Sequence, residues 1–117
     1  MLYEIRNYHL KQESLSDYEC WAKTHALPLL EDQLDVIGFW MLGMPIAECQ
    51  GDIIDELGPA DVTWIIRWQN IEQRNKILPA LLKSTEWQSI FGYLPGGRSI
   101  YRRLESRFCY SLVSARY

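Results

Sequence analysis

Alternating apolar and polar positions, or short apolar runs between turn residues, predict strands at four places in the chain. Residues 2–10 alternate and are rich in Tyr and Ile, and residues 61–68 (DVTWIIRW) form a β-branched and aromatic run. The predicted strands are 2–10, 35–43, 61–68 and 99–104, with an added tail strand at 109–113. Each is bounded by Gly, Pro or polar residues, which favour turns.

Helices are predicted between these strands, because capping boxes precede stretches with apolar residues at helical spacing. The boxes pair Ser16 with Glu19, Asn70 with Gln73, and Thr85 with Gln88. Pro28 is expected to kink or end the first helix and Pro79 to split the second, because proline lacks the N–H that a helix interior needs. The connection from Met44 to Ala60 is long for a compact domain and is expected to hold a helical turn around Ile53–Leu57.

The resulting order of strand, helix, strand, strand, helix, strand predicts an α+β, ferredoxin-like βαββαβ fold with a four-stranded antiparallel sheet. The 117 residues suit one domain, 1–117, with a core at about 2–104 and a C-terminal tail at 105–117. In this fold the helices cover one face of the sheet. We therefore expect a second copy to cover the other face, as a homodimer.

Composition and charge argue against nucleic-acid and membrane partners and indicate the cellular compartment. A net charge of −3 argues against nucleic acid, which needs a basic surface. No apolar run approaches the length of a membrane span, and no signal peptide precedes the first strand. The three cysteines are widely separated and odd in number, which indicates reduced thiols and predicts a cytoplasmic protein.

Four stretches, in order, resemble NIPSNAP-type domains of the dimeric α/β-barrel superfamily. They are MLYEIRNY at 1–8, HALPLL at 25–30 with GFW at 38–40, Arg67-Trp68 followed by Arg74, and EWQ at 86–88. The resemblance covers Leu2 to about Leu104, and the long 44–60 connection and the 105–117 tail depart from it. It implies a dimer of two sheets around a shared pocket. The superfamily includes cofactor-free monooxygenases, polyketide cyclases, isomerases and haem enzymes, so the fold alone leaves the activity open.

Glu4, Arg6 and Tyr8 are the first candidate catalytic residues. Strand alternation places their side chains on one face, which we expect to look into the dimer pocket, with Tyr3 and Ile5 packing against the helices. One interpretation is a structural ion pair of Glu4 with Arg6 or with Arg67. The other is catalytic: Arg6 holds an anionic or enolate oxygen while Glu4 or Tyr8 moves a proton.

His25 is a fourth catalytic candidate, one turn after Trp21 on the first helix. It is interpreted either as a histidine of the core or its rim, or as a general base, or as a haem ligand. His9 is expected to be exposed. Because two histidines without carboxylates at ligand spacing do not make a metal site, no metal is predicted.

Trp40, Trp64 and Arg67 are the candidate substrate-binding residues, on the second and third strands. Alternation puts Trp64 with Ile66 and Trp68 on one face and Arg67 on the other. The tryptophans either fill the core or line a pocket for a flat hydrophobic ligand.

Together these features predict a cofactor-independent enzyme acting on a small hydrophobic or aromatic metabolite by acid/base chemistry. Isomerisation, cyclisation and rearrangement are the reactions expected first, with cofactor-free oxygenation as the alternative chemistry. The alternative is a non-catalytic dimeric ligand carrier or adaptor. No cofactor is predicted.

Overall fold

A computed structural model describes residues 1–114. Its strands and helices follow the predicted βαββαβ order. The strands are β1 (Leu2–Leu10), β2 (Val36–Met41), β3 (Val62–Trp68) and β4 (Tyr101–Cys109). The helices are α1 (Leu15–Trp21), α2 (Leu27–Gln33), α3 (Ile71–Lys83) and α4 (Thr85–Phe91). Short helical segments lie at Gln12–Ser14, Ala22–Ala26, Ile46–Glu48 and Gly97–Ile100.

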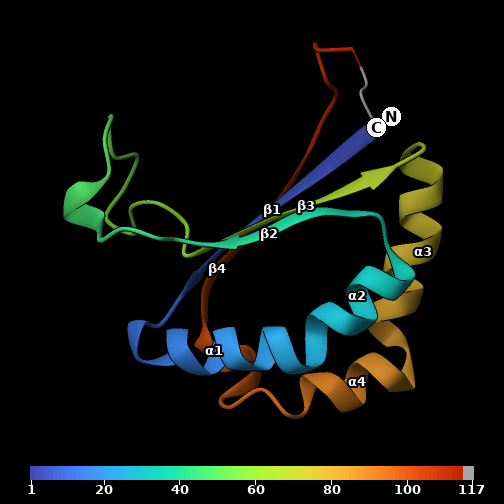
Figure 1. Cartoon of the computed structure of the whole chain (residues 1–117), viewed down its shortest axis with the longest axis horizontal. Helices are drawn as coiled ribbons and strands as arrows, with labels where there is room; N and C mark the ends of the chain where they lie inside the picture. Colours follow the sequence, from blue (N-terminus) through green and yellow to red (C-terminus); the bar gives the residue numbers. More distant parts are fainter. Residues whose placement is uncertain (115–117) are drawn as a thin grey trace.

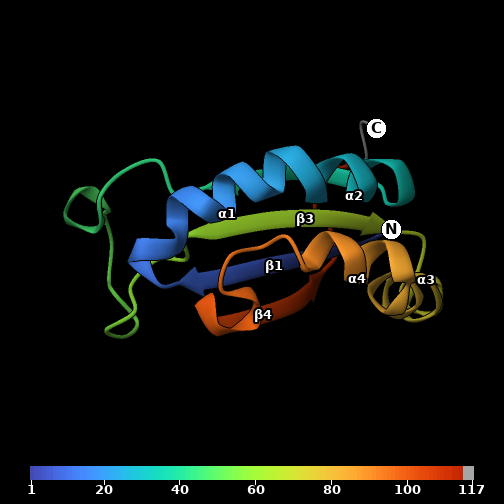
Figure 2. The same cartoon turned by 90° about the horizontal axis from the view of Figure 1, so that it is seen from below.

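Across the described residues the strands form one antiparallel sheet in the order β2-β3-β1-β4. All four helices lie on one side of it, with the other side open (Figure 1). Seen from the helical side, α1 and α2 run alongside β3, and α4 lies across β1 near α3 (Figure 2). The predicted ferredoxin-like fold, with helices on one face, is therefore confirmed.

The core fills the space between the sheet and the helices. β3 is buried at every second residue, which places Val62, Trp64, Ile66 and Trp68 toward the helices. Register pairs Arg6 with Trp64 and Glu4 with Ile66, and paired residues of neighbouring strands point to the same side of a sheet. The face of β1 that carries Glu4, Arg6 and Tyr8 therefore also faces the helices.

The helix boundaries differ from the predicted ones in two of three capping boxes. Asn70 caps α3 as expected, accepting a hydrogen bond from the Gln73 amide at 2.9 Å. Ser84, one residue before the predicted Thr85, caps α4 by accepting from the Trp87 amide. Ser16 lies inside α1 and caps nothing, because a short helical segment at Gln12–Ser14 leads directly into that helix.

Pro79 does not split its helix as predicted, whereas the kink expected from Pro28 near Ala26–Leu27 is confirmed. A π-helical segment, Ala22–Ala26, carries the chain from α1 into α2. Pro28 lies in the first turn of α2, directly after this π-helical segment, and α2 runs at an angle to α1 (Figure 1). Pro79 lies within α3, which continues to Lys83.

The connection between β2 and β3 projects from one end of the sheet and rises on its open side (Figure 1). Its helical turn is at Ile46–Glu48 rather than around Ile53–Leu57. The connection is attached to the sheet by an ion pair between Asp55 and Arg103, with 2.6 Å between Oδ2 and Nη1. His9 was expected to be exposed, but it is buried beside the Gly58 carbonyl, with Nε2 at 3.0 Å.

β4 continues to Cys109, beyond its predicted end at Leu104. The predicted strand at 109–113 does not form, since residues 110–114 lie outside any strand. The last residues of the predicted tail, 115–117, fall outside the described residues. Within residues 1–114, no helix is both long and apolar enough to cross a membrane.

Candidate functional site

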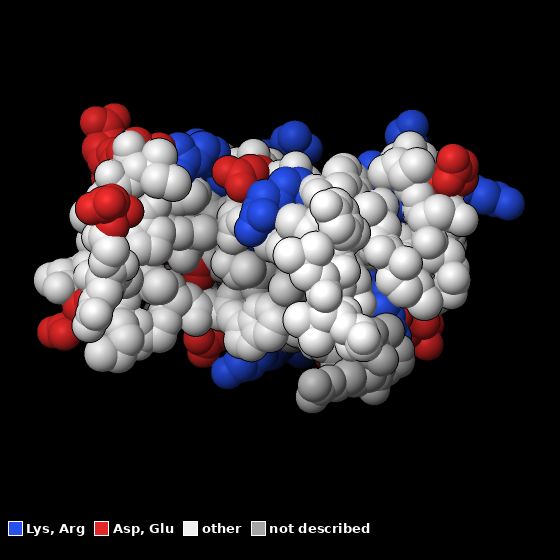
Figure 3. All heavy atoms as spheres, turned by 90° about the horizontal axis from the view of Figure 1, so that it is seen from above, with Lys and Arg blue, Asp and Glu red and all other residues white. Residues whose placement is uncertain are grey.

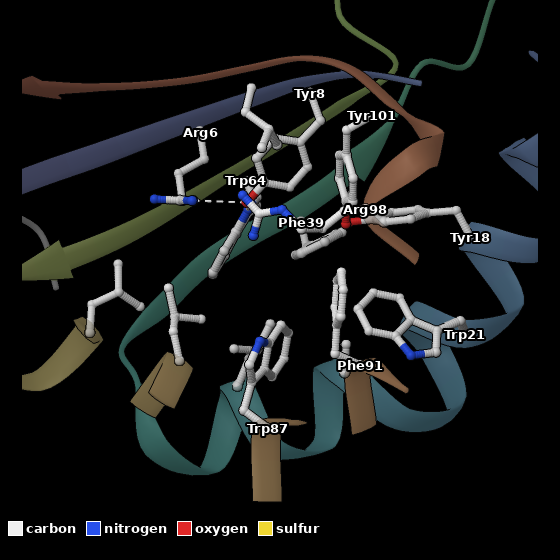
Figure 4. A pocket seen from close by; sticks show the side chains of 15 residues that line it. Arg6, Tyr8, Tyr18, Trp21, Phe39, Trp64, Trp87, Phe91, Arg98 and Tyr101 are labelled. Atoms are coloured by element: carbon white, nitrogen blue, oxygen red, sulfur yellow. Dashed lines mark hydrogen bonds between the residues drawn. The ribbon is translucent and has the colours of Figure 1, made fainter. Parts of the chain in front are cut away.

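A cavity of about 150 Å³ lies between the sheet and the helices. Its lining is mainly apolar and aromatic (Figure 4). A dry cavity of this size can accommodate a benzene ring. The aromatic residues that line it are Tyr8, Tyr18, Trp21, Phe39, Trp64, Trp87, Phe91 and Tyr101.

The cavity opens beside β4. Leu104 on that strand and Arg98 on the turn before it both line the cavity and are exposed. The turn depends on Gly96 and Gly97, which adopt φ angles of 81° and 51° that residues with a Cβ rarely adopt. A Cβ at Gly96 would also come within 2.6 Å of the Ile100 side chain. These glycines therefore position Arg98 at the cavity mouth.

The structure corrects the predicted orientation of β1. Glu4, Arg6 and Tyr8 were expected to face a pocket shared by two subunits, but they point toward the helices of their own chain, as Figure 4 shows for Arg6 and Tyr8. Tyr3 and Ile5, expected against the helices, lie on the open face instead. The charged face can turn inward because Glu4 and Arg6 pair with each other and Arg74 also binds Glu4.

Glu4 is fully buried and receives hydrogen bonds from four described residues. Arg74 on α3 donates through Nε to Oε1 and through Nη2 to Oε2, both at 3.0 Å. The other donors are Arg6 Nη1 at 2.8 Å, Ser106 Oγ at 2.6 Å and Trp68 Nε1 at 3.0 Å.

Burial alone would raise the pKa of Glu4, but the bonds from Arg74, Ser106 and Arg6 lower it to about 2. The predicted structural ion pair of Glu4 with Arg6 is therefore confirmed, with Arg74 as an additional partner. A carboxylate so fully bonded is a poor proton acceptor.

Arg6, Tyr8 and Trp64 form a polar centre at the sheet side of the cavity. Arg6 Nε and Trp64 Nε1 each donate to the Tyr8 hydroxyl oxygen at 2.8 Å. Both lone pairs of that oxygen are occupied, and its proton has no acceptor among the described residues. Burial opposes the charge on Arg6, while the contacts with Tyr8 and Glu4 raise its pKa, so the guanidinium stays charged.

Two further phenols, Tyr18 and Tyr101, lie next to this centre. The Tyr101 ring meets the rings of Tyr8 and Tyr18 edge to face, with centroid distances of 5.5 and 6.3 Å. Burial, followed by the neighbouring phenols, raises the pKa of Tyr18, and burial likewise raises that of Tyr101. Both side chains therefore remain neutral phenols at physiological pH.

His25 does not lie in this cavity. Its ring stacks on Tyr93, with centroids 4.7 Å apart and planes 11° apart. The pair lines a separate shallow groove with Asp17 and Cys20. His25 is half-buried at the rim of the helical layer, apart from Arg6 and Tyr8.

Of the candidate substrate-binding residues, Trp64 lines the cavity, whereas Trp40 and Arg67 lie on the open face. Trp40 is 50% exposed, and its indole lies over Gly38. Arg67 forms an ion pair with Asp35, with 2.7 Å between Nε and Oδ2, rather than with Glu4. Phe39, the neighbour of Trp40 in sequence, lines the cavity instead of Trp40, and its ring lies against that of Trp64.

Several residues of the site were not predicted from sequence. Trp87 and Phe91 lie four residues apart on α4, a spacing that indicates one helix face. Phe39 could have been inferred by pairing β2 with the alternation of β3. No local pattern indicates Ser106 or Arg98, because their contacts depend on the folded chain.

No group of three or more metal-ligating side chains comes together among residues 1–114. The polar groups that line the cavity are the guanidinium groups of Arg6 and Arg98, which only donate hydrogen bonds, and the tyrosine hydroxyl groups, which donate and accept them. Such a set can bind the oxygen of a ligand and stabilise negative charge on it.

The fold is similar to that of solved NIPSNAP structures. A NIPSNAP domain protein from Burkholderia xenovorans superposes with a TM-score of 0.73 at 15% identity, covering 98% of each chain. A NIPSNAP family protein of unknown function from Agrobacterium tumefaciens gives a TM-score of 0.70 at 19% identity, over 93% of this chain and 86% of that one. The resemblance seen in the sequence is thus confirmed at the level of the fold.

An antibiotic biosynthesis monooxygenase is more distant, with a TM-score of 0.56 at 11% identity over 97% of this chain and 100% of that one. No family model and no curated protein matches the sequence.

Proposed function

We propose that the cavity binds a small hydrophobic or aromatic metabolite and that Arg6 and Tyr8 polarise an oxygen atom of that ligand. The observation that carries the proposal is the polar centre of Arg6, Tyr8 and Trp64 on the wall of an aromatic cavity. Ligand sites commonly combine a mainly apolar lining with a few placed polar groups.

The chemistry that suits this centre is cofactor-independent acid catalysis. Arg6 Nη2 has no acceptor among the described residues, and the Tyr8 proton is likewise unassigned. Both can donate to a carbonyl oxygen as it becomes an enolate. Isomerisation, cyclisation or cofactor-free oxygenation of an enolisable substrate would each use such an intermediate.

The second candidate is a ligand carrier that performs no reaction. Within the described residues, neither a carboxylate nor an imidazole lines the cavity, so no general base is evident there. Glu4, the nearest carboxylate to Arg6, is held ionised and fully bonded. This observation favours binding without proton abstraction.

Phenylacetone is a probe that separates these two functions, because it combines a single ring with an enolisable ketone. Binding is measured as a rise in melting temperature and as quenching of the tryptophan fluorescence. Catalysis is measured by NMR as faster exchange of its benzylic protons in D₂O. If the wild type accelerates this exchange and the Tyr8→Phe variant does not, the protein is an enzyme. If phenylacetone binds but its exchange is not accelerated, the protein is a ligand carrier.

The control is a variant that fills the cavity. Ala26 is 1% exposed and lines the cavity, so Ala26→Leu is expected to abolish binding. Leu82→Phe, at another lining residue, on α3, repeats the test if the first variant folds poorly. If both variants fold and bind phenylacetone as tightly as the wild type, the ligand does not bind in this cavity and the proposal is wrong.

We also propose that the open face of the sheet is the homodimer interface. Two segments rise on that side, the 44–60 connection and the residues after β4 (Figure 1). They carry apolar side chains that are almost fully exposed, Ile54 at 98% and Leu112 at 90%. Acidic side chains gather at the end of this face that the connection forms (Figure 3). Most of the surface between that end and the opposite end is uncharged.

Large apolar groups exposed together mark interaction surfaces. Sedimentation velocity is expected to give a dimer for the wild type and a monomer for Trp40→Arg combined with Ile54→Glu. A monomeric wild type would refute the dimer and leave the cavity proposal intact. The cytoplasmic location stays a prediction from the cysteine pattern.

A further inference from the structure

The charges around the cavity do not balance. Glu4 supplies one negative charge, while Arg6 and Arg74, both ion-paired to it, supply two positive charges. Among residues 1–114 no second carboxylate forms an ion pair with either guanidinium. The buried cluster therefore carries a net charge of +1 next to the cavity.

Arg98 adds a second uncompensated charge at the mouth. It lines the cavity, and no described carboxylate or carbonyl accepts a hydrogen bond from its guanidinium. The Gly96-Gly97 turn presents it there, and Figure 4 shows its side chain directed among the aromatic residues of the lining. Arg98 is exposed and lines the cavity, so its guanidinium is accessible to a ligand at the mouth.

We propose that the ligand of this cavity is a small ring-containing carboxylate, with its ring among the aromatic side chains and its carboxylate on Arg98. Guanidinium binds carboxylate with paired, charge-assisted hydrogen bonds. The net positive charge of Glu4, Arg6 and Arg74 also favours an anionic ligand. This charge and the charge of Arg98 both act across a mainly apolar cavity, where electrostatic attraction is weakly screened. This inference rests on the proposed function, because it takes the same cavity as the binding site.

Phenylacetate and phenylacetamide provide the test, because they have the same shape and differ in charge. Calorimetric titration at low salt is expected to show the wild type binding phenylacetate at least about tenfold more tightly than phenylacetamide, the scale of one charged hydrogen bond. Arg98→Gln is expected to reduce that preference by about fivefold or more, because the affinity for phenylacetate falls further than the affinity for phenylacetamide. Arg102→Gln is the matched control, since Arg102 is exposed near the same turn but does not line the cavity.

The possible failures are distinct. Equal affinity of the wild type for the two compounds, or a preference that survives Arg98→Gln, overturns the carboxylate assignment while the cavity proposal stands. Binding of neither compound, nor of phenylacetone, overturns the cavity proposal itself. Loss of the preference in Arg102→Gln as well would show a general surface-charge effect and would also overturn the assignment.

Discussion

Arg74 on α3 binds both carboxylate oxygens of Glu4 on β1, with two nitrogen–oxygen distances of 3.0 Å. The two residues are 70 positions apart in the sequence. A two-point contact of this kind fixes orientation as well as distance. It links the first strand to the second half of the chain directly beside the cavity wall.

The first prediction concerns removal of the buried charge. Glu4→Gln leaves Arg6 and Arg74 without a counter-ion in a buried site, and breaking such a pair costs about 3–5 kcal/mol. We expect a decrease of about 3 kcal/mol in the free energy of unfolding, measured by urea denaturation at pH 7. Glu105→Gln, at an exposed site on β4, should change it by less than about 0.5 kcal/mol. Equal effects of the two substitutions would contradict the role assigned to Glu4.

The second prediction is the acid dependence of stability. Because the pKa of Glu4 is about 2 in the folded chain against an ordinary 4.5, the unfolded state takes up the proton more readily. The stabilisation is complete above pH 4.5 and is lost as the pH falls to about 2, amounting to about 3 kcal/mol. Asp55, whose pKa is lowered by Arg103, changes stability in the same direction.

The measurement is the free energy of unfolding from pH 7 to pH 2 for the wild type and Glu4→Gln. The difference between the two proteins should shrink over that acid range. A constant difference would show that the carboxylate has its ordinary pKa in the folded chain.

The third prediction concerns the hydroxyl group of Tyr8. Tyr8→Phe removes the acceptor of two donors, Arg6 Nε and Trp64 Nε1. Leaving buried donors unpaired costs about 1–3 kcal/mol, so we expect a loss of that size in urea denaturation. Tyr93→Phe keeps the ring that stacks on His25 and is expected to have little effect. Similar losses from both variants would show that the hydroxyl bonds of Tyr8 contribute little.

The fourth prediction concerns the position of Trp40 on the open face. Its indole lies over Gly38, so closely that a Cβ at that glycine would overlap the ring. The ring current should shift the Gly38 α-proton resonances upfield, and Trp40→Ala should remove that shift. Leu42→Ala, nearby on the connection, should leave the resonances unchanged. Gly38 resonances that do not respond to Trp40→Ala would contradict this placement.

Sequence patterns predicted several features of the local structure correctly. The alternation of β3, the Asn70 cap and the strand–helix order depend on neighbouring residues, and each agrees with the structure. The Ser16 cap was wrong because a preceding helical segment continued into α1, which a capping pattern does not exclude.

Alternation also showed that Glu4, Arg6 and Tyr8 share a face, but tertiary structure decided which face that is. A period of two residues separates the two sides of a strand without saying which is covered. Charged side chains would be expected outward unless their partners are known, and those partners, Arg74 and Ser106, lie 70 and 102 residues away. The sequence therefore determined the fold and the grouping of the candidate residues. Only the packing of α3 and β4 against β1 decided that Arg6 and Tyr8 line an internal cavity and that Glu4 is buried behind Arg6.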